Sequence, residues 1–311
     1  MSDYIFERVD ESRYKDLSFL VRESFGSVKG YDYFKHKMDT GYLGVKHLGY
    51  LAYDSAGKPA AFYGVYPCMV EYNGVHYLAA QSGDTMTHPK HGGKGLFTML
   101  AKMTYELAKK EGVQFIFGFP NSNSYPGFVK KLNWIHKEDM TNYTSAVVTL
   151  PFAALAHKFT LVEFLYRYYV RGIMTFFKSN KSFLVNSALK NSIGSVLHDS
   201  NFFKYKSFNE NFLIDLSGVT AWIKVDGCLL VGDIELTSLQ HFEKLWSGLK
   251  RIAFITGCTK IIFPLNPGCA WDKLLKGNVK AEKGMYIGYL DLQSGLPLEN
   301  FKYVGADYDT F

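Results

Sequence analysis

The sequence predicts an α/β protein built from two domains. Its 311 residues exceed the usual size of one domain, and 47% of them are hydrophobic while 21% are charged, as in folded chains with sizeable cores. Stretches that alternate apolar and polar residues are joined by Asn73–Gly74 and Asp226–Gly227, two pairs that favour tight hairpins. Amphipathic helical patterns lie between these stretches, so strands and helices are mixed along the chain.

The first half predicts strands and helices in a definite order. A strand over Tyr4–Val9 precedes a helix over Glu11–Phe25 and a shorter helix near Tyr31–Met38. An antiparallel meander follows, and then a long helix over Gly95–Glu111 that ends at Gly112. The strands of the meander are expected at about His47–Tyr53, Pro59–Tyr66, Tyr66–Tyr72 and Val75–Thr87.

The second half predicts a similar mixture of elements. A hairpin of Thr220–Val225 and Cys228–Leu236 comes first, and a helix over Leu239–Ile252 and a strand over Lys260–Pro264 follow. A short helix and a last strand complete a β-β-α-β-α-β order, at Ala270–Leu275 and Met285–Leu292. No glycine-rich phosphate loop follows a strand in this half, so it is not expected to bind a nucleotide.

A glycine-rich loop joins the meander to the long helix. The segment Thr85–Leu100 contains Gly92, Gly93 and Gly95 just before the helix begins. Glycine lets the backbone turn sharply and approach a ligand closely, and the unpaired N–H groups of a first helical turn attract an anion. The spacing is neither that of an NTPase loop nor GxGxxG. The loop predicts a pyrophosphate site, and a plain helix-entry turn is the alternative.

The segment Tyr77–Trp134 resembles the core of the GNAT superfamily of acyl-CoA-dependent N-acyltransferases. The loop reads Gly-Gly-Lys-Gly-Leu-Phe over residues 92–97, and Phe-Gly-Phe-Pro-Asn over residues 117–121 precedes a segment that ends in Leu-Asn-Trp. Gly95 keeps the central glycine of the family loop. Four positions depart from the family pattern, namely Gly92, Phe97, Val129, where many members carry a tyrosine acid, and Asn133. The resemblance implies a GNAT fold, a mixed and largely antiparallel twisted sheet flanked by helices.

The resemblance also implies that acetyl-CoA is the cosubstrate. Its pyrophosphate would lie on the loop, and its pantetheine arm would enter where the strand ending at Thr87 splays away from the strand over Phe115–Phe119. The amides of Asn121 and Asn123 either contact the coenzyme or form a turn. A backbone N–H near Met86 or Thr87 is the implied oxyanion donor. The cofactor-binding residues are therefore expected to be Met86, Thr87, Gly92, Gly93, Lys94, Gly95, Leu96, Phe97, Thr98, Asn121 and Asn123.

Direct acyl transfer to an amine needs a base, oxyanion donors and an acid for the leaving thiolate. Strand alternation places Ser82, Asp84 and Met86 on one face. Asp84 is the carboxylate nearest the expected thioester and is the predicted base; its alternative is to cap a turn or bind a cation. His88 is a second candidate base, or an ordinary loop histidine. Tyr125 is the predicted acid, or a packing aromatic.

The segment after the first domain is basic and aromatic. It contains Phe164, Tyr168, Arg167 and Arg171 among similar residues. We expect a linker helix that buries its rings, and the alternative is a helix on an anionic membrane surface. The resulting organisation is an acyl-CoA-binding catalytic GNAT domain over residues 1–150, this linker over 151–206, and a degenerate GNAT-like domain over 207–311 that shapes the acceptor site.

The aromatic carboxyl terminus suggests that the end of the chain is docked. The pairing of a GNAT core with a coenzyme-free domain is similar to that of enhanced-intracellular-survival acetyltransferases, in which the terminal carboxylate reaches the active site. That resemblance implies a catalytic role for the Phe311 carboxylate, or for Asp307 or Asp309, at the acceptor site. Simple anchoring of the terminus by Tyr308 and Phe311 is the alternative.

Charge and cysteine content exclude several classes of protein. The formal charge of +6 is spread along the chain, so nucleic acid is not an expected partner. The four cysteines lack metal-ligand spacing, so we expect no metal, no disulfide framework and a cytoplasmic protein with reduced thiols, at Cys68, Cys228, Cys258 and Cys269. No leader pattern or apolar run of about 18 residues occurs, so neither secretion nor a membrane span is expected.

The sequence therefore predicts an acetyltransferase that moves an acetyl group from acetyl-CoA directly to a primary amine of a small molecule, for which the resemblance suggests an amino sugar. Two other classes stay open. One is a non-catalytic module that binds acyl-CoA or a membrane surface. The other is a tandem-GNAT aminoacyl transferase, which would not need the intact loop around Gly95.

Overall fold

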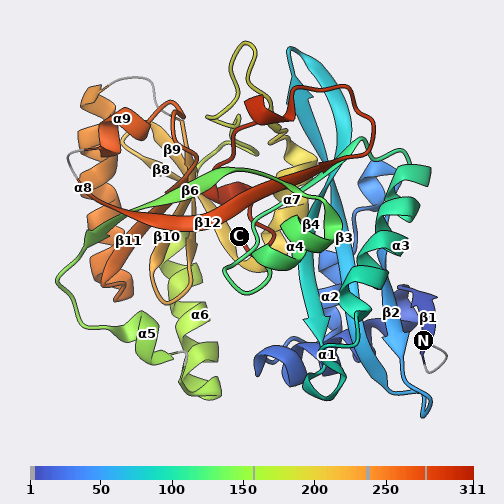
Figure 1. Cartoon of the computed structure of the whole chain (residues 1–311). Helices are drawn as coiled ribbons and strands as arrows, with labels where there is room; N and C mark the ends of the chain where they lie inside the picture. The colour runs from blue at the N-terminus through green and yellow to red at the C-terminus, as the bar shows by residue number, and fades with distance from the viewer. Residues whose placement is uncertain (1–3, 157, 236–238, 277–278) are drawn as a thin grey trace. The chain divides into compact units, whose positions relative to one another are not determined.

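A computed structural model of the chain describes residues 4–156, 158–235, 239–276 and 279–311 (Figure 1). The chain divides into two compact units. Unit 1 comprises Met1–Glu138 and Tyr286–Glu299, and unit 2 comprises Asp139–Met285 and Asn300–Phe311. These units are not the contiguous segments with boundaries at residues 150 and 206 that we expected. The long strands β6 and β12 explain the difference, because each contributes residues to both units, at Ile135–Ala146 and Lys280–Asp291.

Unit 1 is built on a mostly antiparallel sheet with the strand order β1-β2-β3-β4-β5-β12. All neighbouring strands in it run antiparallel except β4 and β5, which are parallel. The sheet and its helices confirm the predicted mixed α/β class. The remaining strands are β1 (Ile5–Arg8), β2 (Leu48–Tyr53), β3 (Pro59–Tyr72), β4 (Val75–Thr87) and β5 (Phe115–Gly118).

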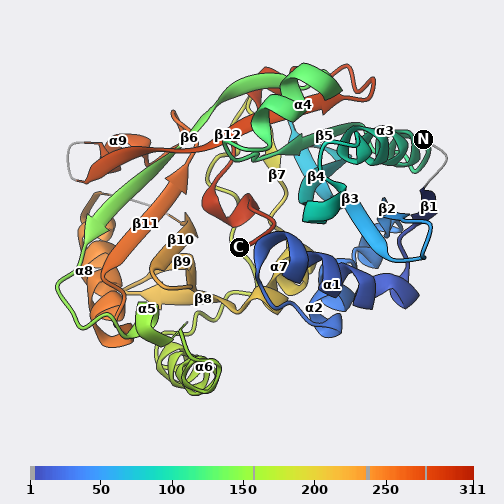
Figure 2. The same ribbon diagram turned by 60° about the horizontal axis from the view of Figure 1, so that its bottom comes forward.

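Helices cover both faces of this sheet (Figure 2). Helices α1 and α2 lie on one face, where Leu17 and Leu20 pack with Phe62. Helices α3 and α4 lie on the other, where Leu100 packs with Tyr63. Each helix buries residues three or four positions apart, as an amphipathic helix must. The bounds are Tyr14–Phe25 for α1, Tyr31–Lys37 for α2, Leu96–Lys110 for α3 and Tyr125–Leu132 for α4.

Strand β3 is one long strand, so the predicted strand boundary at Tyr66 is wrong. Its pairing with β2 ends at Leu48–Val65, whereas its pairing with β4 continues to Tyr72. Pro67 therefore lies beyond the end of β2, where its missing N–H removes no hydrogen bond to that strand. The hairpin at Asn73 is confirmed, since both turn residues have positive φ, 51° and 77°.

Unit 2 also contains a mixed sheet, with the strand order β12-β6-β11-β10-β9-β8. Gly227 has a φ of 66° between β9 and β10, which confirms the second predicted hairpin. Strand β8 was not predicted, and Leu236, where the hairpin was expected to end, lies outside the described residues. The elements of this part are β8 (Asn211–Leu216), β9 (Val219–Val225), β10 (Leu229–Ile234), α8 (Leu239–Thr256), β11 (Lys260–Leu265) and α9 (Asp272–Leu275).

The basic aromatic segment forms two helices followed by an irregular stretch. These are α5 (Phe152–Ala156) and α6 (Thr160–Thr175), and α7 (Ser200–Lys206) comes after the short strand β7 (Ser195–Val196). Most of the large apolar side chains of α6 are exposed, so the helix does not bury its rings as a linker was expected to do. None of the described helices is long and apolar enough to cross a membrane.

The carboxyl terminus is anchored within unit 2 by buried polar and aromatic contacts. His198 Nε2 lies 2.7 Å from Asp307, and its Nδ1 lies 3.6 Å from Asp233. Burial alone would lower the pKa of His198, but the two carboxylates raise it to about 9. The ring of Phe311 packs edge-on against Trp222, 5.6 Å away between ring centroids. A charged histidine between two carboxylates therefore holds the last turn of the chain in place.

Candidate active site

The loop before α3 is shaped by glycine. His88 opens it, and the Nδ1 atom of its ring accepts a hydrogen bond of 3.2 Å from the Lys90 N–H. Gly93 and Gly95 have φ values of 74° and 77°, in the left-handed region that favours glycine. A Cβ at either position would meet no atom within 4 Å. The loop therefore turns sharply while it faces open space.

The backbone N–H groups at the start of α3 are free to bind a ligand. The first hydrogen bond of the helix runs from the Met99 N–H to the Gly95 carbonyl, at 3.1 Å. Within the described part of the chain, no acceptor takes a hydrogen bond from the backbone N–H groups of residues 93–98. Together with the positive end of the helix dipole, these groups suit a pyrophosphate.

Strand β4 runs on past the end of its pairing with β5 beside this loop, a place that we call the split, and the predicted splaying of the two strands stays a prediction. Their pairing ends at Ser82–Gly118, whereas β4 continues to Thr87. The His88 N–H donates to the Ala60 carbonyl of β3 at 2.9 Å. Because N–H groups alternate sides along a strand, the Met86 N–H also points toward β3 and the Thr87 N–H points into the split. Of the two predicted oxyanion donors, the geometry therefore favours Thr87.

Asp84 lies in a β-bulge of β4. The pairing of β3 with β4 shifts register between Phe62 and Gly64, so that Asp84 and Thr85 together face Tyr63. Asp84 has a φ of 47°, a left-handed conformation that is uncommon for a residue other than glycine. Bulges re-aim side chains and leave backbone groups unpaired, which is why they occur beside active sites.

The bulge also reverses the alternation of side chains along β4. Ser82 Oγ lies 2.8 Å from the Tyr63 hydroxyl, which belongs to the core under α3. Asp84 instead contacts Lys37 of α2 on the opposite face, where Met86 is also buried. The expectation that Ser82 shares a face with Asp84 and Met86 is therefore wrong, because the extra residue of the bulge changes the register.

A chain of buried hydroxyl groups lies next to the split. Tyr63 bonds to Ser82 and to the Tyr105 hydroxyl, which accepts a hydrogen bond of 2.9 Å from Trp134 Nε1. Burial raises the pKa of both tyrosines, so they stay neutral and act as hydrogen-bond partners. Trp134 also packs closely on Gly118, where a Cβ would lie 3.2 Å from its ring. These contacts hold the end of β5 at the split.

The Asp84 carboxylate is paired with a buried ammonium. Lys37 Nζ lies 2.7 Å from Asp84 Oδ2, and the Tyr66 hydroxyl donates a hydrogen bond to the same carboxylate. Lys37 is fully buried and lies over the rings of Tyr33 and Tyr66. Asp84 thus binds a cation, as its alternative interpretation held. The role of Asp84 as base stays a prediction, and no motif in the sequence pointed to Lys37.

The other candidate base, His88, is packed against α1. Its ring stacks on Phe19 with an interplanar angle of 15°, and Nε2 lies 3.8 Å from the Glu23 carboxylate. The side chain is therefore held in the core-facing part of the loop. Its catalytic role is untested by this arrangement and stays a prediction.

Tyr125 begins α4 and is held by two aromatic neighbours. Its ring stacks on Tyr286 of β12 at a centroid distance of 4.0 Å and meets His136 edge-on at 5.3 Å. This packing is the alternative that we gave for Tyr125, and it also fixes the ring at the start of the helix. The role of the hydroxyl as acid stays a prediction.

The residues around Asn121 form a turn. The side-chain oxygen of Asn121 accepts hydrogen bonds of 3.0 Å from the N–H groups of Asn123 and Ser124. Turn formation thus accounts for Asn121, while the exposed Asn123 stays available for a ligand. The Phe97 side chain packs on Phe128 and closely on Gly127, so only its backbone faces the predicted pyrophosphate.

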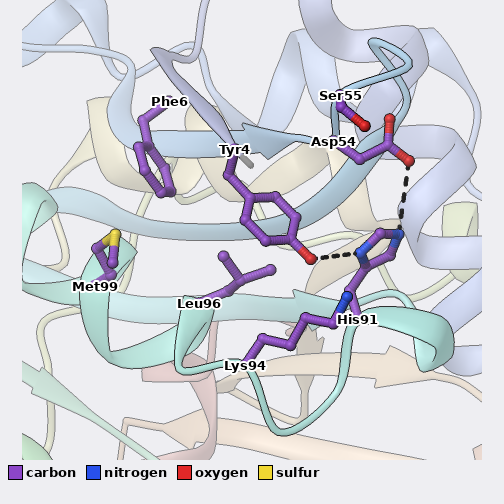
Figure 3. A pocket seen from close by; sticks show the side chains of 8 residues that line it. All are labelled: Tyr4, Phe6, Asp54, Ser55, His91, Lys94, Leu96 and Met99. Carbon is purple, nitrogen blue, oxygen red and sulfur yellow. Dashed lines mark hydrogen bonds and ion pairs between the residues drawn. The ribbon is translucent and has the colours of Figure 1, made fainter. Parts of the chain in front are cut away.

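A cavity of about 450 Å³ opens beside the loop (Figure 3). Lys94, Leu96 and Met99 line it from the loop and α3. Phe6 of β1 and Tyr4, which directly precedes β1, line it from the amino-terminal side. No sequence motif pointed to this cavity. Among the described residues, no cluster of His, Cys, Asp and Glu could hold a metal ion.

Comparisons with known proteins agree with this geometry. Residues 6–136 match the family model described as an acetyltransferase (GNAT) domain. No curated protein matches the chain. The matched part contains the glycine loop, the bulge and both strands beside the split.

Solved structures share the fold over almost the whole chain. A GCN5-related N-acetyltransferase from Kribbella flavida has a TM-score of 0.60 at 15% identity, over 94% of this chain and 72% of that one. A probable N-acyltransferase of unknown function from Enterococcus faecalis V583 has a TM-score of 0.63 at 14% identity, over 96% of this chain and 75% of that one. A GCN5-related N-acetyltransferase from Anabaena variabilis ATCC 29413 has a TM-score of 0.55 at 9% identity, over 92% of this chain and 72% of that one. The fold is therefore GNAT-like, and residues 6–136, less than half of the chain, match the family model of a GNAT acetyltransferase domain.

Proposed function

We propose that the protein transfers an acetyl group from acetyl-CoA directly to the primary amine of a small molecule such as an amino sugar. The family supports acyl transfer in general. The choice of donor is supported by one observation, the free N–H groups of residues 93–98 next to the split between β4 and β5. A pyrophosphate on those groups would direct an extended pantetheine arm along Thr87, which ends β4.

The chain offers one group for each proton transfer. The amine nitrogen would attack the thioester carbon, so that the N–C bond forms as the C–S bond breaks. The Thr87 N–H would stabilise the carbonyl oxygen as it gains negative charge. Asp84 would take the amine proton, directly or through water, and the Tyr125 hydroxyl would protonate the leaving thiolate. This scheme needs no covalent enzyme intermediate.

The charge around Asp84 supports a small, hydroxyl-rich acceptor. Lys37 offsets the charge of Asp84 at 2.7 Å, so the pair presents no net negative charge to a polycation. Recognition would then rest on hydrogen bonds more than on long-range attraction, which suits an amino sugar. We also propose that unit 2 is a degenerate GNAT-like domain. Its strand and helix order without a glycine-rich loop supports that assignment, and a role for Phe311 at the acceptor stays a prediction.

The test of donor binding is calorimetry with acetyl-CoA on Gly95→Asp. We expect the affinity to fall at least about 100-fold, because the new carboxylate faces the phosphates and like charges at a binding site cost several kcal/mol. Gly74→Asp is the matched control, since Gly74 also has a φ of 77° and open space around it but lies in the hairpin between β3 and β4. Equal affinities for the wild type and Gly95→Asp would contradict the proposed pyrophosphate site.

Turnover is tested by the release of free thiol from acetyl-CoA across a panel of amino sugars, amino acids and polyamines. We expect release with at least one small primary amine. Acetyl-CoA binding without turnover on any amine would instead support the non-catalytic module. No acetyl-CoA binding would support an aminoacyl transferase that takes its donor from elsewhere.

A further inference from the structure

The cavity beside the glycine loop is not needed for the acyl transfer step. It lies among Tyr4, Phe6, Asp54, Ser55 and the first turn of α3, and Figure 3 shows these side chains facing one space. Its walls differ in chemistry. One wall is aromatic and apolar, another carries a carboxylate and a hydroxyl, and the loop supplies an ammonium.

The aromatic and apolar wall suits a planar ring. The rings of Tyr4 and Phe6 stand on one side, and Leu96 and Met99 stand on the other (Figure 3). Tyr4 is held in place because its hydroxyl lies 2.8 Å from His91 Nδ1. A flat heteroaromatic base gains stacking and burial on such a surface.

Asp54 supplies an oriented hydrogen-bond acceptor at the rim. Its Oδ1 accepts hydrogen bonds of 2.9 Å from the N–H groups of Ala56 and Lys58, and these bonds fix the carboxylate. The hydrogen bond from Lys58 is the main reason that the pKa of Asp54 is lowered, so the group is ionised at neutral pH. The second oxygen, Oδ2, lies 3.8 Å from His91 and can accept a hydrogen bond from an amino or hydroxyl group.

Lys94 supplies a positive charge to the cavity. Its Nζ lies 5.7 Å from the centroid of the Tyr4 ring. Within the described ranges, no carboxylate lies within ion-pair distance of it. His91 adds no charge at neutral pH, because burial and then the charge of Lys94 lower the pKa of His91. The cavity thus combines one ammonium with an aromatic wall and an acceptor.

We propose that this cavity binds the 3′-phosphoadenosine end of acyl-CoA. The inference rests on the proposed function, since Lys94 and Leu96 line both the cavity and the pyrophosphate loop. The adenine would lie between the rings of Tyr4 and Phe6 and the side chains of Leu96 and Met99. Asp54 would accept a hydrogen bond from the adenine amino group or a ribose hydroxyl, and Lys94 would pair with the 3′-phosphate.

The first test compares CoA with dephospho-CoA, which lacks only the 3′-phosphate, by calorimetry on the full-length protein. We expect CoA to bind the wild type at least about tenfold more tightly, since dephospho-CoA cannot make the charge-assisted contact between the 3′-phosphate and Lys94. Lys94→Ala should remove this preference. The readout is the ratio of the two affinities within each variant, because Lys94 also belongs to the loop. Lys90→Ala, which changes a lysine of the same loop outside the cavity, should keep the wild-type ratio.

The second test concerns the aromatic wall. Tyr4→Ala should weaken both CoA and dephospho-CoA by about tenfold, a loss of the size found when one base loses its aromatic partner. The same variant should bind acetyl-pantetheine, which has no nucleotide, as the wild type does. A loss of acetyl-pantetheine binding would show that Tyr4→Ala disturbs the fold. In that case Tyr4→Phe, which keeps the ring, is tested instead and should bind CoA and dephospho-CoA with wild-type affinity.

The outcomes separate this inference from the proposed function. If acetyl-CoA binds and Gly95→Asp abolishes binding, but CoA and dephospho-CoA bind equally, the cavity proposal is overturned and acyl transfer stands. If 3′,5′-ADP binds and acetyl-CoA does not displace it, the cavity holds a separate nucleotide and the proposal is also overturned. If acetyl-CoA does not bind at all, both proposals fail.

Discussion

Lys37 and Asp84 depend on each other because one of them is entirely enclosed. The ammonium of Lys37 is buried, and its ion-pair partner is Asp84 at 2.7 Å. A buried charge that loses its partner keeps its desolvation penalty, which costs about 3–5 kcal/mol in measured cases. The same carboxylate is the predicted base, so Asp84 would contribute both to the stability of the fold and to catalysis.

We predict that Lys37→Met and Asp84→Asn each destabilise the protein by about 3 kcal/mol. The double variant should lose clearly less than the sum, because no unpaired charge is left inside. Urea unfolding of the four proteins measures this coupling from the midpoints and slopes. Strictly additive losses would show that the ion pair contributes nothing beyond its separate side chains.

The elements that could be predicted from sequence are those set by local chemistry. Asn73–Gly74 and Asp226–Gly227 form hairpins because both positions tolerate positive φ. The long helix after Gly95 follows from its periodic apolar residues. The bulge at Asp84 was missed, because it depends on how β4 pairs with β3 and not on the sequence of β4 alone. For the same reason Ser82 was wrongly predicted to share a face of β4 with Asp84 and Met86.

Helix α6 is unusual because its apolar side chains face solvent. Phe164, Leu165 and Tyr168 are all more than half exposed, whereas Val170 and Met174 are buried. Contiguous exposed apolar surface of this kind marks a site that meets a partner or a membrane. The charges of α6 do not decide between these, since Arg167 and Arg171 pair with Glu163 and Glu210.

We predict that Phe164→Ser/Leu165→Ser changes the free energy of unfolding by less than about 1 kcal/mol, because surface side chains contribute little to folding. Val170→Ser, one turn further along the same helix and buried, should cost more than about 2 kcal/mol. Urea unfolding compares the two variants. The membrane-surface alternative would be supported if the wild type, but not the double variant, co-sediments with vesicles that contain an anionic lipid. A large loss of stability in the double variant would show that these side chains are buried.

Unit 1 is completed by a strand from near the end of the chain. Residues of β12 pair with β5 from Gly288–Gly118 to Asp291–Phe115, and the Leu292 N–H then donates to the Gln114 carbonyl at 3.0 Å. Local sequence patterns predict strands but not which distant strand lies beside them. For this reason the domain that we predicted over residues 1–150 does not contain the β12 residues that belong to unit 1.

We predict that a truncated protein of residues 1–150 is poorly stable and aggregates, because β5 would expose an unpaired edge. Joining residues 286–299 to it through a flexible linker should restore a monomer with cooperative unfolding. Size-exclusion chromatography and urea unfolding compare the two proteins. A monomeric, cooperatively unfolding fragment of residues 1–150 would show that β12 is dispensable for unit 1.

The pairing of Gly118 with Gly288 also has a consequence for synthesis on the ribosome. Proteins are made from the amino end, so β5 is synthesised long before its partner strand β12. One edge of β5 therefore stays unpaired while most of unit 2 is translated. Contacts between such distant residues also form slowly. Until β12 pairs with it, the free edge of β5 leaves a nascent chain of this protein open to aggregation.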